Sequence, residues 1–208
     1  MNSKEDEIVN IVLGALKEHK AIIHPTDTIP GLSFDPDDDR GRQAVVQFKG
    51  REETKPFLGL VSSLEQAKKF WQPLPAGWSQ KLEKLWPGPL SVVWQASEDA
   101  PRRLVGTDGT MGLRVPALHP ENQWYLKVLG ELGKPMPTTS VNHAGQQPAL
   151  NWAEVSKKVL ESDVDVFVTP GEFPSGDKPS TIIRLLEGGG FEVLREGAIP
   201  RRDLEQYE

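Results

Sequence analysis

Two short stretches combine charged and neutral polar side chains at a spacing suited to binding an anion. Lys49 and Arg51 stand on either side of a glycine, so an ammonium and a guanidinium fork could flank a phosphate close to the backbone. Ser140 and Asn142 would project on one side of an extended chain and offer a hydroxyl and an amide. Taken singly, each stretch could also be an ordinary polar turn.

A polar loop with the sequence PTDTIPGL follows a short apolar stretch, and it is too rich in proline for a helix or a strand. Ligands of open α/β sheets bind where strands end, which favours a binding role for Thr26, Asp27 and Thr28. The same three residues could serve as turn and helix-capping residues.

Arginines near two further stretches need a partner. Arg114 lies in the apolar segment GLRVP, where a lone guanidinium must find an anion or reach solvent. An internal salt bridge and a bound ligand explain it equally well. The same choice applies to Ser180, Thr181 and Arg195, which lie on or beside expected strands near the C-terminus.

Composition excludes several classes of chemistry. The chain of 208 residues has no cysteine and four histidines, so disulfides and thiolate nucleophiles are excluded and a zinc site is not expected. Its net charge of −6 argues against a generally basic nucleic-acid surface but leaves room for a local cluster of cations. No phosphate-binding glycine loop, Rossmann fingerprint or G-x-S-x-G elbow is present.

No apolar run approaches the roughly 20 residues that cross a bilayer. The N-terminal stretch MNSKEDEIVN is acidic where a signal peptide is basic and then apolar. These features predict a cytoplasmic protein with no membrane partner.

The elements that must position the candidate residues alternate between short helices and short strands, which predicts an α/β domain with a mixed twisted sheet. Helices are expected at 3–19, 39–48, 63–70, 77–86, 121–132 and 152–160. Strands are expected at 21–24, 57–61, 90–96, 112–115, 136–139, 164–168, 181–185 and 191–194.

Taken in order, eight segments resemble the YrdC-like family, whose enzymatic members are threonylcarbamoyl-AMP synthases. They are HPTDTIPGL, KGR, KPFLGLVSS, LWPGPLSVVW, GLRVP, TTSVNHAG, KPSTIIRL and VLREGAI. The resemblance covers nearly the whole chain. It implies one YrdC-like domain over residues 1–208, with a twisted mixed sheet flanked by helices around a concave, positively charged cavity. Because no additional C-terminal domain is expected, the resemblance is to the short, single-domain type.

The resemblance also implies an activity. L-threonine, bicarbonate and ATP would give L-threonylcarbamoyl-AMP and pyrophosphate, for N6-threonylcarbamoyladenosine modification of tRNA. Mg²⁺ would accompany ATP as its counterion, with no metal held by the protein itself. Further partners would be tRNA, bound weakly, and the machinery that transfers the threonylcarbamoyl group. The alternative function is a non-catalytic RNA-binding or ribosome-associated paralogue of the same fold.

The resemblance assigns roles residue by residue. The nucleotide would be held by a tetrad of Lys49, Arg51, Ser140 and Asn142. Lys49 and Arg51, both expected to be solvent-accessible, would stabilise the charge that develops during adenylation. Ser180 and Arg195 would bind the ATP phosphates. Thr28 and Arg114 would bind threonine, the arginine pairing with its carboxylate.

The chain departs from the family pattern on both sides of the PTDT loop. His24 stands where an aromatic residue is common, and Pro30 replaces the tyrosine of T-x-Tyr-Gly-Leu. These departures fall on the expected amino-acid pocket and predict relaxed amino-acid selectivity. Glu52 and Glu53 follow KGR where proline is often found, and they add negative charge beside the predicted phosphate cations.

Overall fold

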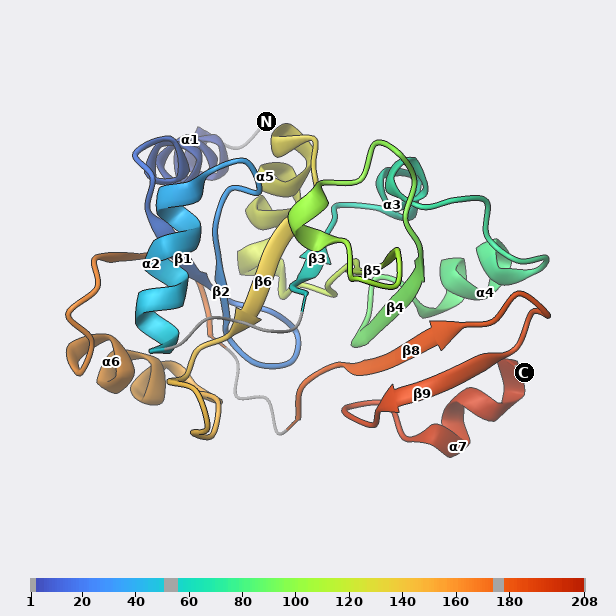
Figure 1. Ribbon diagram of the computed structural model, residues 1–208. Coiled ribbons are helices and arrows are strands. Elements are labelled where there is room, and N and C mark those ends of the chain that lie inside the picture. Colours follow the sequence, from blue (N-terminus) through green and yellow to red (C-terminus); the bar gives the residue numbers. More distant parts are fainter. Residues whose placement is uncertain (1–2, 51–55, 174–177, 208) are drawn as a thin grey trace.

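A twisted mixed β-sheet runs through the protein (Figure 1). The computed structural model describes residues 3–50, 56–173 and 178–207. Over these residues nine strands pair in the order β7-β1-β2-β6-β3-β5-β4-β8-β9. The pairs β1–β7, β3–β5 and β4–β8 are parallel, and the remaining pairs are antiparallel. The predicted mixed α/β fold is confirmed.

The strands are short. They are β1 Ala21–His24, β2 Gly31–Ser33, β3 Leu58–Leu60, β4 Leu90–Gln95, β5 Thr110–Arg114, β6 Met136–Ser140, β7 Val166–Val168, β8 Thr181–Leu185 and β9 Phe191–Arg195. Eight of the nine lie on segments predicted as strands. The exception is β2, which was predicted as part of a loop. Three residues that include a glycine give little signal, and β2 is a strand because it pairs with both β1 and β6.

Helices flank the sheet. They are α1 Ser3–Lys17, α2 Asp39–Lys49, α3 Leu64–Phe70, α4 Trp78–Leu85, α5 Trp124–Leu132, α6 Trp152–Leu160 and α7 Arg201–Leu204. In Figure 1, α1 and α5 lie side by side, and α7 lies beside β9. Only α7 was not predicted, because a single turn gives no apolar period. No helix in the described parts of the chain is long and apolar enough to cross a membrane.

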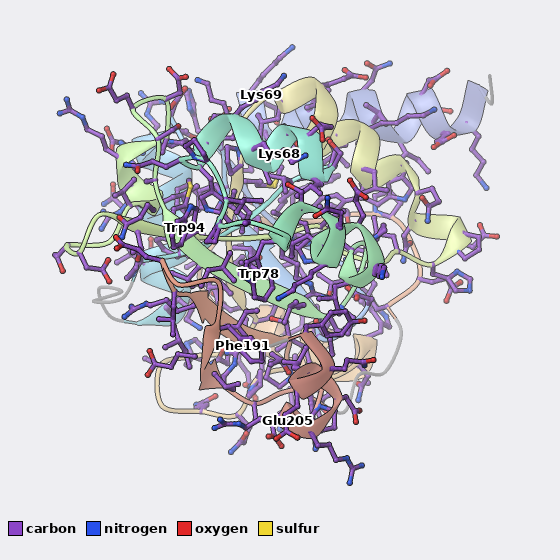
Figure 2. The ribbon with its side chains drawn as sticks, turned by 90° about the vertical axis from the view of Figure 1, so that its right-hand side faces the viewer. Lys68, Lys69, Trp78, Trp94, Phe191 and Glu205 are labelled. Carbon is purple, nitrogen blue, oxygen red and sulfur yellow. The ribbon has the colours of Figure 1, made fainter. Side chains whose placement is uncertain are left out.

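Helix α4 fixes the hairpin of β8 and β9. Trp78 and Phe191 meet edge to face with their ring centroids 6.0 Å apart, and Figure 2 shows them next to each other between helix and hairpin. The Trp78 indole Nε1 also donates a hydrogen bond of 2.8 Å to the carbonyl of Gly189, at the hairpin turn. Such contacts add to the apolar burial of Trp78. The hairpin is therefore anchored at the end opposite Ser180 and Arg195.

His24 closes β1 on the side of the sheet that α5 covers. Its ring is fully buried and stacks on Tyr125 with the centroids 4.4 Å apart. Nδ1 lies 3.2 Å from the Pro25 carbonyl and Nε2 lies 2.8 Å from the Ser33 hydroxyl. A neutral ring satisfies both, since Nδ1–H can donate and Nε2 can accept. Burial lowers the pKa of His24 from 6.5 to about 4.

This burial makes stability depend on pH. Below pH 6.5 the unfolded chain protonates His24, whereas the folded protein resists protonation down to about pH 4. Stability is therefore lost as the pH falls through this window, by on the order of 3 kcal/mol in total. Urea unfolding at a series of pH values should show the loss, and His24→Phe should abolish this component of it. His119→Phe, at an exposed histidine, is the control that should keep it. An unchanged pH dependence in His24→Phe would contradict the assignment.

Candidate functional site

A pocket of about 480 Å³ opens on the sheet. Its wall contains seven of the eight residues that the sequence singled out, drawn from segments far apart in the chain. They are Thr28, Lys49, Arg114, Ser140, Asn142, Ser180 and Arg195. The eighth, Arg51, lies outside the described residues, as do Glu52 and Glu53. The binding roles of all eight residues stay predictions.

Lys49 is the last residue of α2. The Asp38 side chain caps the start of this helix, and Gly50 ends it in the left-handed conformation with φ 74°, which glycine adopts at little cost. Lys49 Nζ donates to the Ser140 carbonyl at 3.0 Å and to Asn142 Oδ1 at 2.9 Å. These contacts join α2 to the end of β6.

The prediction that Lys49 is solvent-accessible is wrong, because the residue is only 4% exposed. The loop after β6 covers it. Ala144 N–H donates to the Lys49 carbonyl at 2.8 Å, and the His143 ring stacks on Phe48 with the centroids 5.7 Å apart. Lys49 therefore reaches the pocket from a packed position and not from a solvated turn.

Asn142 makes as many hydrogen bonds as its side chain allows. Its Oδ1 accepts from Lys49 Nζ at 2.9 Å and from Ser140 Oγ at 2.5 Å. Its Nδ2 donates to the carbonyls of His143 and Gln146 at 2.8 and 3.0 Å. An amide has two acceptor sites and two donor hydrogens, so all four are used. Asn142 thus orients Lys49 and Ser140, and a direct contact with a ligand would have to replace one of these bonds.

Arg114, the last residue of β5, is held at three of its nitrogens. Nε donates to the Gly88 carbonyl at 3.0 Å, NH1 donates to Thr28 Oγ1 at 2.9 Å, and NH2 forms an ion pair with Asp27 Oδ1. The internal salt bridge left open by the sequence is therefore present, and Arg114 also lines the pocket. Burial lowers the pKa of Arg114 and raises that of Asp27, while each charge opposes the shift of the other.

The hydrogen bonds of the two threonine hydroxyls in the PTDT loop each have a defined direction. Thr26 Oγ1 donates to the Ile29 carbonyl at 2.7 Å, so its own hydrogen is used. In the 3.1 Å contact between Thr26 Oγ1 and Thr28 Oγ1, Thr28 must then be the donor. Since Thr28 Oγ1 also accepts from Arg114, its remaining capacity is that of an acceptor. A ligand group at Thr28 would have to donate a hydrogen.

Ser180 and Arg195 meet where β8 begins and β9 ends. Arg195 NH2 donates to the Ser180 carbonyl at 2.7 Å, and Ser180 Oγ lies 2.9 Å from Ser91 Oγ in β4. Burial lowers the pKa of Arg195. Gly197 passes so close to this corner that a Cβ there would lie 2.2 Å from the Pro179 carbonyl oxygen. Because glycine has no side chain, the backbone at Gly197 can pass directly beside Ser180.

Apolar residues complete the wall. Pro30 was expected beside the amino-acid pocket, whereas the others carry no chemical group that would single them out. Those others are Ile29, Pro56, Phe57, Leu58, Leu60, Pro148, Pro179 and Ile182. The polar residues that were missed are Thr138, Thr139 and Gln146, of which the last could have been indicated by the polar stretch after Asn142. His24, expected beside the amino-acid pocket, is absent from the described lining because its ring faces α5.

The charged residues among the described lining are Lys49, Arg114 and Arg195, and no Asp or Glu is part of that lining. Nor do the described residues hold any group of three or more His, Asp and Glu placed for a metal ion. The wall thus offers donors and positive charge, as an anionic ligand requires.

Comparisons with known proteins agree with this geometry. The family model Sua5_yciO_yrdC, described as "Telomere recombination", matches residues 14–197. A threonylcarbamoyl-AMP synthase of Klebsiella pneumoniae is 29% identical over 94% of this chain and 99% of its own. One of Pyrococcus abyssi is 27% identical over 97% of this chain.

The P. abyssi enzyme is longer, and this chain spans 57% of it. A crystal structure of P. abyssi Sua5 complexed with L-threonine superposes with a TM-score of 0.81, at 27% identity, over 98% of this chain and 57% of the other.

Proposed function

The chain belongs to the Sua5_yciO_yrdC family, and we propose that it synthesises L-threonylcarbamoyl-AMP from L-threonine, bicarbonate and ATP, with release of pyrophosphate. The observation that carries the proposal is the pocket. Its wall brings together three cationic side chains and the hydroxyl groups of Thr28 and Ser180, from segments far apart in the sequence. The names of the relatives support the same reaction. The product would serve N6-threonylcarbamoyladenosine modification of tRNA, in the cytoplasm.

The amino acid would bind beside β5. Arg114 uses three of its five N–H groups within the protein, so two remain for a carboxylate. Thr28 offers an acceptor, which suits the hydroxyl or the amine of threonine. The crystal structure of P. abyssi Sua5 complexed with L-threonine supports this part of the proposal.

The nucleotide would occupy the rest of the pocket. In the adenylation step an oxygen of threonine carbamate attacks the α-phosphorus of ATP, and the bond to pyrophosphate breaks. Negative charge grows on the phosphate oxygens, and Lys49, Arg195 and the predicted Arg51 would stabilise it without a covalent intermediate. Mg²⁺ would arrive with ATP, held by phosphate oxygens, since the described lining offers it no carboxylate.

The test is a pyrophosphate-release assay in which ATP, bicarbonate and threonine are omitted one at a time and the product is identified by its mass. We expect release to require all three. Release without threonine, or no adenylate of the expected mass, would reject the proposed reaction. Tight RNA binding that is insensitive to salt and to ATP would then favour the non-catalytic alternative, whereas weak tRNA binding that falls steeply with salt agrees with the synthase.

Pro30 lines the pocket two residues after Thr28, and it can supply neither a hydroxyl nor an aromatic face. We therefore expect serine and valine to compete with threonine, with discrimination of only about 10- to 200-fold in kcat/KM. Pro30→Tyr should sharpen the preference for threonine. Pro73→Tyr, at an exposed site outside the pocket, should leave it unchanged. Strict threonine preference in the native protein, unaltered by Pro30→Tyr, would mean that other residues read the hydroxyl.

A further inference from the structure

The two arginines of the pocket differ in their counter-charges. Arg114 is ion-paired with Asp27, and the two side chains are only 6% and 12% exposed. Arg195 instead donates to the carbonyl and, at 3.4 Å, to the hydroxyl of Ser180. Among the described residues no carboxylate lies within ion-pair distance of Arg195. One guanidinium therefore carries its own counter-ion, and the other has none among the residues that the structure describes.

This difference decides which anion each arginine favours. A phosphate with two or more negative charges gains little from Arg114, because the attraction of the guanidinium is offset by repulsion from Asp27 a few ångströms behind it. A carboxylate carries one charge and can still take the two remaining N–H donors in a bidentate contact. Arg195, which is exposed at the pocket wall, acts on a phosphate with its full charge because no carboxylate among the described residues pairs with it.

We propose that Asp27 is a positioning residue that reserves Arg114 for a carboxylate and keeps phosphate groups out of that part of the pocket. It acts through Arg114, since Asp27 is not among the residues that line the pocket. Asp27 holds NH2 while Thr28 holds NH1, so it also fixes the orientation of the guanidinium. The inference rests on the proposed function for the identity of the two ligands, an amino acid and a nucleotide.

Inorganic pyrophosphate is the probe, and its binding is measured by calorimetry without threonine, bicarbonate or ATP. In an otherwise native background, Arg195→Ala should weaken binding about tenfold or more, the loss of one charge-assisted contact. Arg114→Ala combined with Asp27→Asn removes both charges of the ion pair and should change it less than about twofold, because the pair carries no net charge. Equal weakening by Arg195→Ala and by this double substitution would overturn the proposal.

Asp27→Asn should leave the positive charge of Arg114 without its counter-charge. We expect pyrophosphate to bind about tenfold tighter or at a second site, and to become a competitive inhibitor against threonine. Asp27→Glu keeps the charge and should keep native pyrophosphate affinity. Asp108→Asn is the matched control, because Asp108 pairs with Arg184 at 3.1 Å on the surface and neither residue is part of the described pocket lining. It should change neither pyrophosphate binding nor turnover.

Unchanged pyrophosphate binding in a folded Asp27→Asn variant would also overturn the proposal. If that variant does not fold, the comparison of the double variant Arg114→Ala/Asp27→Asn with Arg195→Ala still decides. Failure of the proposed function is a separate result, because it is seen as threonine-independent release of pyrophosphate, which the binding measurement does not involve.

Discussion

Lys49→Ala is expected to lower kcat by about 100-fold or more while the protein stays folded. In the proposed reaction Lys49 is a preorganised cation near the α-phosphate that acts mainly in the transition state, and loss of one such donor has an effect of this size in other enzymes. Lys49 is already held at 3.0 and 2.9 Å by Ser140 and Asn142, so it needs no reorganisation during the reaction. Steady-state pyrophosphate release at saturating substrates measures the effect.

The control for this prediction is Lys127→Ala, which removes an exposed lysine that pairs with Glu5 at 3.0 Å, far from the pocket wall. It should keep native turnover. A thermal melt of both variants separates a loss of catalysis from a loss of folding. Full activity in Lys49→Ala, or its unfolding, would assign the residue a structural role, joining α2 to the end of β6.

Gly197→Ala is expected to damage both stability and activity. The new methyl group would lie 2.2 Å from the Pro179 carbonyl oxygen and 2.6 Å from the Ser180 carbonyl carbon, so backbone must move. Overpacking of this kind costs about 1–3 kcal/mol. Movement of the Pro179–Ser180 backbone would displace Ser180, and movement of Gly197 would displace Arg195 two residues earlier. The affinity for ATP should therefore fall as well. Chemical denaturation and the KM for ATP are the two measurements.

Gly14→Ala is the matched control for Gly197→Ala, because nothing lies within 4 Å of the Cβ that it would add. Gly14 is in the middle of α1, where alanine is favoured over glycine by up to about 1 kcal/mol. This variant should be at least as stable as the native protein and fully active. If Gly197→Ala behaves like Gly14→Ala, the crowded corner is not required.

Much of the fold was predictable because local signals agreed with the final structure. Ser63 caps α3 as expected, its Oγ accepting from Gln66 N–H at 3.1 Å, and α6 begins and ends at the predicted residues. The signals failed where tertiary contacts decide. β2 is a strand only because it has neighbours on both sides, and α7 is too short to show a period.

The residues of the site were predictable, but their burial and their internal hydrogen-bond partners were not. The resemblance selected seven residues that share one pocket, yet it predicted an accessible Lys49 that proves to be buried. The local sequence around Arg114 left open whether this residue has an internal partner, and the partner, Asp27, is 87 positions away. No local pattern reports a contact at that separation. Only the packing of the PTDT loop against the end of β5 brings the two together.

The four hydrogen bonds of Asn142 have a thermodynamic consequence for ligand binding. Because they link α2, β6 and the loop that follows, the rotamer freedom of Lys49, Ser140 and Asn142 is already lost when the protein folds. A ligand that enters therefore does not have to immobilise them, which would otherwise cost about 0.5–1.5 kcal/mol for each side chain. Affinity on this side of the pocket is limited by desolvation of the ligand and not by ordering of the protein.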